Sequence, residues 1–263
     1  MRKIRFAQEQ IIETLNEPQG GALPNVLAKH AFFFDLGETL YTYADVPLSW
    51  SEHYRPALVG AALEYGVRIT NEKLDAAIAE LSKFDTRKYP RLVEHPADFI
   101  FRQVIFALGL TVDYLETLIA GFFRYFRQRL RVYPDAFILL TYLSSRSIYT
   151  GALTDVTYGM PRTFVLDDLN EARLQNLILE VLTSVDVGYR KPGPEGFLEL
   201  SQGACTLPEL CYYIGNEEKD IKGALNAGLM PVLIWRQDCP APSWGQAVTV
   251  SSLDRLISFI EGR

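Results

Sequence analysis

Four groups of polar residues have types and positions that could carry chemistry. Asp35 follows one apolar run, Thr154 follows a second, the acid-rich stretch 216–220 follows a third, and Lys191 precedes a proline in a glycine-rich segment. A carboxylate can act as a nucleophile, a hydroxyl and an ammonium can hold anionic oxygens, and acidic side chains bind hard cations. If the fold brings these groups together, they form a reaction centre.

Each of these residues also has an ordinary interpretation. An Asp or a Thr at the end of a strand usually caps a helix or makes a turn, and a lysine before proline is usually solvated. In open α/β sheets, however, ligands bind at the carboxyl ends of the strands. A carboxylate, a hydroxyl, an ammonium and an acidic cluster at such positions therefore favour one shared site over four unrelated roles.

Five nearly continuous apolar runs have the length of strands. They lie at 27–34, 147–153, 177–184, 210–214 and 230–235. Continuous apolar runs are typical of parallel strands that are covered by helices on both faces. Helix-like stretches lie between these runs, at 134–145, 192–203 and 218–228. We predict an α/β fold with a Rossmann-like, doubly wound parallel sheet.

Residues 43–132 interrupt this pattern, because they have helical periodicity and no convincing strand. One predicted helix face is apolar and largely aromatic, and it consists of Leu115, Leu118, Ile119, Phe122, Phe123, Phe126 and Leu130. Packing against neighbouring helices explains such a stripe better than contact with a ligand does. We predict an inserted bundle of helices.

The polar motifs, in this order, resemble those of the haloacid dehalogenase superfamily of hydrolases. The first motif is matched by DLGETL, which begins at Asp35, and the second by Thr154. The third is matched by Lys191 and Pro192, and the fourth by GNEEKDIKGALNAG, which begins at Gly215.

The resemblance implies a division into domains. The core domain would consist of residues 28–42 and 133–263. Residues 43–132 would form a helical cap domain between the first and second motifs, which is the C1 type of cap. Residues 1–27 would be an N-terminal extension, with a short helix near 4–15.

The resemblance also implies an activity and roles for individual residues. Asp35 would be the nucleophile of a phosphatase that acts on a small phosphorylated metabolite through an aspartyl-phosphate intermediate. Thr154 and Lys191 would hold the oxygens of the transferred group, and Thr39 and Asp155 would help to bind the substrate. Backbone amides of the loop after Asp35 would add donors for anionic oxygens.

Mg²⁺ is the cofactor that the resemblance implies. Its candidate ligands are Asp35, the backbone carbonyl of Gly37, Asn216, Glu217 and Asp220, which offer the oxygen donors that a hard cation prefers. Asn216 stands where the family has an acid, so metal binding should be weakened. Asp220 has a second interpretation, as the residue that orients the motif lysine or the waters of the metal.

The catalytic acid and base of the family is also replaced. Phosphatases of the family carry a second Asp two residues after the nucleophile, and this chain has Gly37 there. Loss of such a group costs about 10²- to 10⁴-fold in rate. Glu38 is the candidate replacement, and the alternative is that it faces solvent or pairs with a cap residue.

These departures leave two other functions open. A catalytically impaired relative would bind a phosphorylated ligand or a protein partner without turnover. A metal-independent 2-haloacid dehalogenase would receive the halide with a cap arginine and aromatic residues, for which the candidates are Arg55, Tyr41, Tyr43 and Trp50. Their spacing is unpersuasive, and surface or core roles explain them better.

Composition restricts the partners. The formal net charge is −6 and the pI is about 5.2, so no nucleic-acid partner is expected. No segment has the length of a membrane span or of a secretory signal. The three cysteines form no CxxC pair, which fits a reducing, cytoplasmic setting. The oligomeric state stays open, with a homodimer among the alternatives.

Overall fold

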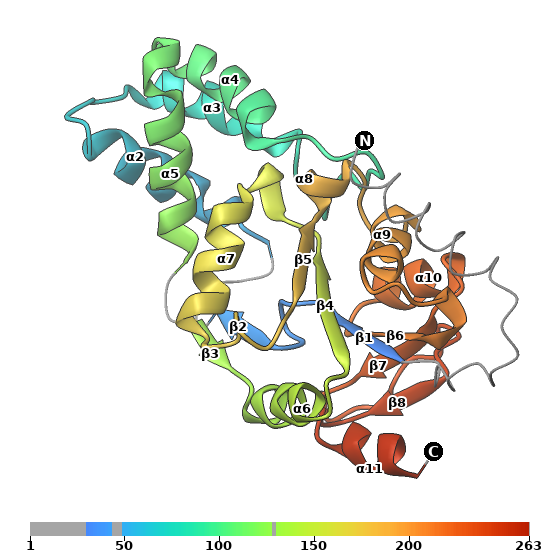
Figure 1. Ribbon diagram of the computed structural model, residues 1–263. Coiled ribbons are helices and arrows are strands. Elements are labelled where there is room, and N and C mark those ends of the chain that lie inside the picture. Colours follow the sequence, from blue (N-terminus) through green and yellow to red (C-terminus); the bar gives the residue numbers. More distant parts are fainter. Residues whose placement is uncertain (1–29, 44–48, 128–129, 263) are drawn as a thin grey trace, which may run out of the picture.

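A six-stranded parallel sheet forms the centre of the larger part of the molecule in the computed structural model (Figure 1). The structure describes residues 30–43, 49–127 and 130–262. The strands are β1 (Ala31–Phe34), β4 (Tyr149–Thr154), β5 (Glu180–Thr183), β6 (Cys211–Gly215), β7 (Met230–Ile234) and β8 (Val248–Val250). Their spatial order is β5-β4-β1-β6-β7-β8, and every neighbouring pair is parallel. The predicted doubly wound α/β fold is confirmed.

The chain changes direction across the sheet at β1. After β1 it forms β4 and β5 on one side, and it later forms β6, β7 and β8 on the other side. Ligands of open α/β sheets bind at such a switch point, beyond the carboxyl ends of the strands. Asp35 is the first residue after β1, so the topology places the predicted nucleophile at the switch point.

Helices cover both faces of the sheet. On one face lie α6 (Pro134–Ser145), α7 (Arg162–Glu171) and α11 (Arg255–Glu261); on the other lie α9 (Glu195–Gly203) and α10 (Glu218–Asn226). The short helix α8 (Ser184–Val187) follows β5, and 3-10 helices lie at Ser51–His53, Val112–Tyr114, Thr157–Gly159 and Pro208–Leu210. Side chains of β1 point alternately to the two faces, so Phe34 packs in the first core and Phe33 in the second.

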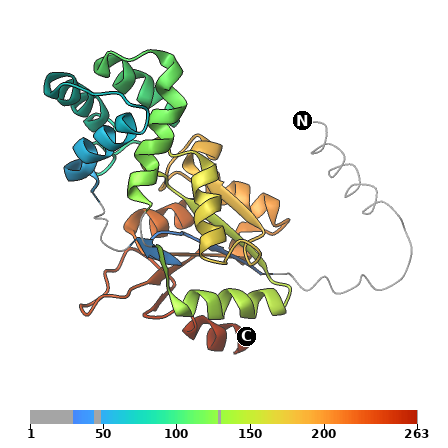
Figure 2. The same cartoon turned by 90° about the vertical axis from the view of Figure 1, so that its left-hand side faces the viewer.

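Four helices with a core of their own form the cap, which is the part of the described chain between residues 49 and 127. They are α2 (Tyr54–Leu63), α3 (Asn71–Ser82), α4 (Ala97–Leu108) and α5 (Leu115–Phe126). Figure 2 shows them together, in blue to green, at one end of the sheet domain. The predicted apolar stripe is buried along α5, except that Leu130 lies beyond the helix and is half-buried.

Two short strands, the hinge strands, join the cap to the core. β2 (Tyr41–Tyr43) and β3 (Leu130–Val132) pair antiparallel, with Tyr41 opposite Val132. The sequence analysis predicted no strand between residues 43 and 132, but the structure has β3 there. With three residues each, these strands are too short to produce a periodic pattern.

The loop between α3 and α4 makes a further connection to the core. The Glu94 amide donates to the Gly188 carbonyl at 2.9 Å, and the Arg190 amide donates to the Leu92 carbonyl at 2.7 Å. Val93 and Tyr189 form an antiparallel bridge between these bonds. The cap is therefore attached by backbone hydrogen bonds beside the motif that contains Lys191.

Two predictions concern other parts of the chain. The N-terminal extension and its short helix lie outside the described residues. Among the helices that the structure describes, none is long and apolar enough to cross a membrane.

Candidate active site

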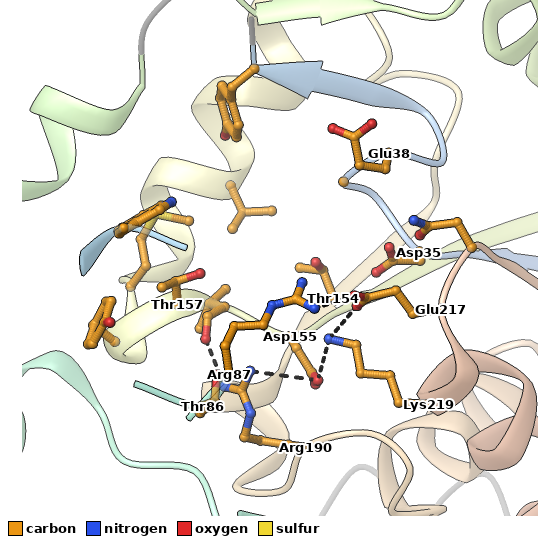
Figure 3. A pocket seen from close by; sticks show the side chains of 18 of the residues that line it. Asp35, Glu38, Thr86, Arg87, Thr154, Asp155, Thr157, Arg190, Glu217 and Lys219 are labelled. Atoms are coloured by element: carbon orange, nitrogen blue, oxygen red, sulfur yellow. Dashed lines mark hydrogen bonds and ion pairs between the residues drawn. The ribbon is translucent and has the colours of Figure 1, made fainter. Parts of the chain in front are cut away.

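Asp35 and Lys191 form an ion pair at the bottom of a cleft between the sheet and the cap. The Asp35 amide donates to the Ile214 carbonyl of β6 at 2.9 Å, which fixes the residue at the end of β1. The Lys191 Nζ lies 2.7 Å from the Asp35 Oδ1. Thr154, at the end of β4, lines the same cleft, whose volume is about 190 Å³. Figure 3 shows Asp35 and Thr154 in this cleft, so three of the predicted residues converge.

The ammonium of Lys191 is buried among oxygen atoms. It lies 2.6 Å from Asp220 Oδ1, 3.1 Å from the Tyr213 hydroxyl and 3.4 Å from the Leu153 carbonyl oxygen. Burial alone would lower the pKa of this lysine, but Asp220 and Asp35 raise it well above its usual value. Lys191 is therefore a fixed positive charge directly beside Asp35, the predicted nucleophile.

Asp220 is fully buried and holds Lys191 in place. Its Oδ2 accepts hydrogen bonds from the amides of Asn216, at 3.1 Å, and Glu217, at 2.9 Å. Both oxygens of the carboxylate therefore have partners within the protein. This arrangement favours the second interpretation of Asp220, in which it orients the lysine.

The carboxyl group of Asp35 has an unusual acidity. Burial raises its pKa, the nearby Lys191 lowers it, and Asp220 raises it again, so that the pKa of Asp35 is about 6 instead of 3.8. Near neutral pH the group is a carboxylate that burial makes less stable than it would be in water. A buried carboxylate of this kind is a better nucleophile than a solvated one.

Asp155 positions the backbone of the third motif. Its Oδ1 accepts a hydrogen bond from the Lys191 amide at 3.0 Å, and its Oδ2 lies 3.2 Å from Lys219 Nζ. Burial raises the pKa of Asp155, but Lys219 and Arg190 lower it further than burial raises it. Asp155 lines the cleft as a carboxylate that is already paired with a cation.

Glu38 lies beside the cleft, one residue after the position of the missing Asp. Its carboxylate accepts hydrogen bonds from the hydroxyl of Thr42 and, at 2.9 Å, from the hydroxyl of Tyr133. Its backbone has a φ of 58°, which is a left-handed conformation that few residues other than glycine adopt. This backbone conformation turns the side chain back toward the hinge strands, where the two hydroxyls hold it.

The predicted substrate residue Thr39 is fully buried. Its hydroxyl donates to the Asn216 side-chain oxygen at 3.3 Å, and it does not line the cleft. The side chain of Thr39 therefore connects the first motif to the fourth. Substrate contact by this loop would have to come from backbone amides.

The candidate metal ligands divide into two groups. Asp35, Gly37 and Asn216 all line the cleft. Glu217 lines it too, but its carboxylate forms ion pairs with Arg87 at 2.5 Å and with Lys219 at 2.9 Å. Within the described ranges, no three His, Cys, Asp or Glu side chains are arranged to hold a metal ion. A cation here would therefore depend on neutral oxygens and waters besides Asp35.

Among the residues considered for a dehalogenase, Tyr41, Tyr43 and Trp50 line the cleft, whereas Arg55 does not. Arg55 pairs with Asp75 on the surface of the cap, away from the cleft. The Tyr43 hydroxyl donates to Asp168 of α7, which also accepts a hydrogen bond from Arg127 at 2.7 Å. These contacts give Arg55 and Tyr43 structural roles at the cap surface and at the hinge.

Three functional contacts escaped the sequence analysis. Arg87 reaches into the cleft from the cap, and Lys219 pairs with Asp155 and Glu217. Glu94, in the loop attached to the core, accepts hydrogen bonds from Arg190 and, at 2.6 Å, from Ser184. Lys219 lies within the fourth motif and could have been singled out there, but no local pattern marks Arg87 or Glu94.

Comparison with known proteins identifies the family. A family model described as haloacid dehalogenase-like hydrolase matches residues 66–234. The match covers more than half of the chain, and it includes the second, third and fourth motifs. The chain belongs to the haloacid dehalogenase-like hydrolase family, as the motifs predicted.

Individual relatives are distant but nearly as long as this chain. The glyceraldehyde 3-phosphate phosphatase of Methanopyrus kandleri is 27% identical over 215 residues, which cover 78% of this chain and 84% of the relative. That of Methanothermobacter thermautotrophicus is 25% identical over 209 residues, with the same coverage. The crystal structure of a 2-haloacid dehalogenase from Pseudomonas syringae pv. Tomato aligns with a TM-score of 0.65 and 21% identity, covering 89% of this chain and 99% of that one. The last similarity concerns the fold alone.

The first prediction from the site concerns the buried Glu94. In Glu94→Gln, Arg190 loses the nearer of its two carboxylate partners and keeps only Asp155 at 3.7 Å, so we expect the free energy of unfolding to fall by about 3 kcal/mol. Urea denaturation measures it. Glu64→Gln is the matched control, because Glu64 forms an exposed pair with Arg124 and its loss should cost less than about 1 kcal/mol. Equal effects of the two substitutions would contradict a buried, structurally important pair.

The second prediction concerns Asp35 and pH. The folded protein binds the Asp35 proton more tightly than the unfolded chain, so this group's contribution to stability falls as pH rises from about 4 to about 6. Asp35→Asn removes that loss, and it should stabilise the protein by about 1–3 kcal/mol at pH 7.5 and by much less at pH 4.5. Denaturation of both proteins at both pH values, with a chelator present, measures the difference. A gain that does not depend on pH would contradict the raised pKa.

Proposed function

We propose that this chain is a phosphatase that hydrolyses small phosphate monoesters through an aspartyl-phosphate intermediate at Asp35. One observation carries the proposal: the carboxylate of Asp35 and the buried ammonium of Lys191 lie 2.7 Å apart at the switch point of the sheet. Two relatives named as phosphatases of a three-carbon phosphate support the reaction class. The cleft volume of about 190 Å³ supports a small substrate.

In the first step, an oxygen of Asp35 attacks the phosphorus and the ester bond to the leaving group breaks. Lys191 and the hydroxyl of Thr154 bind oxygens of the transferred phosphoryl group and compensate the charge that develops there. Asp220 and Asp155 keep Lys191 in position, through its ammonium and its backbone amide respectively. In the second step, water attacks the phosphorus of the aspartyl phosphate and inorganic phosphate leaves.

Glu38 is the group that we assign to proton transfer. It donates a proton to the leaving oxygen in the first step and accepts one from the attacking water in the second. Its place beside the cleft, one residue after Gly37, supports this role. The hydroxyls of Thr42 and Tyr133 donate to its carboxylate and hold the side chain in this place.

Mg²⁺ is the cofactor that we propose. Asp35, the Gly37 carbonyl and the Asn216 side-chain oxygen would hold it, and these donors fit a cation that keeps several waters and binds few carboxylates. When bound, it would shield the charges of Asp35 and the phosphate from each other. Glu217 and Asp220 already pair with cations of the protein, so we do not assign them to the metal. Affinity for Mg²⁺ should be low, because Asn216 contributes no charge.

Hydrolysis of glyceraldehyde 3-phosphate, with Mg²⁺ and with a chelator, tests the proposed function. The wild-type protein should release phosphate in the presence of Mg²⁺, and Asp35→Asn should reduce the rate by about 10⁴-fold or more, because the nucleophile is lost. Glu64→Gln, on the outer surface of the cap, should leave the rate unchanged. Metal-independent turnover of 2-chloropropionate without any phosphatase activity would favour the dehalogenase instead, and turnover of neither would favour the ligand-binding protein.

Substitution of Glu38 tests the replacement of the missing acid. Glu38→Gln should lower kcat by about 10²- to 10⁴-fold, because neither proton transfer is then assisted. If the second step becomes the slow one, acid-quenched samples should contain more phosphorylated protein than the wild type. A decrease in kcat of less than about threefold would remove Glu38 from the mechanism.

A further inference from the structure

Arg87 brings a positive charge from the cap into the cleft. It lies in the loop after α3, and its backbone amide donates to the buried carboxylate of Asp85 at 3.0 Å. Its side chain is 47% exposed and reaches across to Glu217 of the core, with 2.5 Å between Nη1 and Oε1. Figure 3 shows the guanidinium of Arg87 pointing toward the side of the cleft that holds Glu217 and Asp35. The loop is anchored, while the charged end of the side chain is accessible.

The other cations of the described cleft have structural partners. Arg190 is buried against Glu94 and the Val156 carbonyl, and Lys219 pairs with Asp155 and Glu217. Lys191, at the bottom of the cleft, is buried between Asp35 and Asp220. Arg87 differs from them, because its one ion pair with a described residue is to Glu217, a carboxylate that has a second cation.

Glu217 can therefore lose its ion pair with Arg87 and still have a cation beside its negative charge. Lys219 lies 2.9 Å from its other oxygen. When an anion enters the cleft, Arg87 can leave Glu217 and pair with the anion. Glu217 then keeps its ion pair with Lys219.

We propose that Arg87 binds a carboxylate on the leaving group of the substrate, which makes small phosphorylated carboxylic acids the preferred substrate class. The inference rests on the proposed phosphatase function. The phosphate belongs to Lys191 and Thr154 in the core, so the leaving group must face the cap, where Arg87 lies. The planar guanidinium has five donors and matches a carboxylate in a bidentate manner.

Because other carboxylates line the cleft, an acidic substrate should need Arg87 in order to bind. Glu38 and Glu217 both line the cleft and would repel a substrate carboxylate that had no cation beside it. From the cap, Trp50, Thr86 and the buried carboxylate of Asp85 line the cleft beside Arg87. The cleft volume of about 190 Å³ fits a short acid. Removal of Arg87 should thus weaken binding of acids and have little effect on neutral analogues.

The test compares 3-phosphoglycerate with glyceraldehyde 3-phosphate, which differ in having a carboxylate or an aldehyde at the same carbon. The wild type should have the higher kcat/KM for the acid. Arg87→Gln should raise KM for the acid by about 10- to 100-fold and for the aldehyde by less than about threefold, with kcat nearly unchanged for both. Arg87→Lys should recover part of the loss. Arg124→Gln is the matched control, because Arg124 forms an exposed ion pair on the cap outside the cleft.

Two results would overturn the inference. An equal rise of KM for both substrates would mean that Arg87 acts on the phosphate or on the shape of the cleft. Unchanged kinetics for both would mean that Arg87 serves only its ion pair with Glu217.

A binding measurement separates this inference from the phosphatase proposal. In Asp35→Asn protein, which does not turn over, 3-phosphoglycerate should raise the unfolding temperature more than glycerol 3-phosphate does, and Arg87→Gln in that background should abolish the difference. This result would support the role of Arg87 even if the wild type hydrolysed neither compound. Equal shifts with the two ligands would overturn it, whatever the activity.

Discussion

The burial of the Lys191 ammonium is the constraint on which the rest of the site depends. A charge removed from water is costly unless it is paired and hydrogen-bonded, and Lys191 has two carboxylates, a hydroxyl and a carbonyl oxygen around it. These partners come from the ends of β1, β4 and β6 and from the start of α10. The lysine can be accommodated only when the three central strands are in register and α10 is in place.

The attachment of the cap extends this constraint. Besides the hinge strands, the loop carrying Glu94 pairs with the backbone beside Lys191, and Arg190 is buried against it. Arg87 then connects the cap to Glu217 at the mouth of the cleft. The position of the cap and the charge of the active site are therefore coupled, because the same side chains determine both.

The residues at the two departures from the family pattern have hydrogen-bond partners of their own. Where an acid is replaced by Gly37, the next residue, Glu38, adopts a left-handed backbone and is held by two hydroxyls beside the cleft. Where an acid is replaced by Asn216, its side-chain oxygen accepts the hydroxyl of Thr39 and connects two motifs. Glu217 is the carboxylate of the fourth motif that lines the cleft, and it forms ion pairs with Lys219 and Arg87. The site thus has more internal charge compensation than its motifs alone would suggest.

The sequence by itself determined the fold class, the order of the motifs and the residues at the strand ends. These features follow from local apolar runs and from the rule that parallel strands bring their carboxyl ends to one edge. Only the tertiary structure decided how the charges pair: Asp220 with Lys191, Glu217 with Arg87, and Glu94 with Arg190. The last two pairs join residues separated by 130 and 96 positions. Carboxylates and cations at such separations have many alternative partners in the chain, and packing of the cap against the core selects among them.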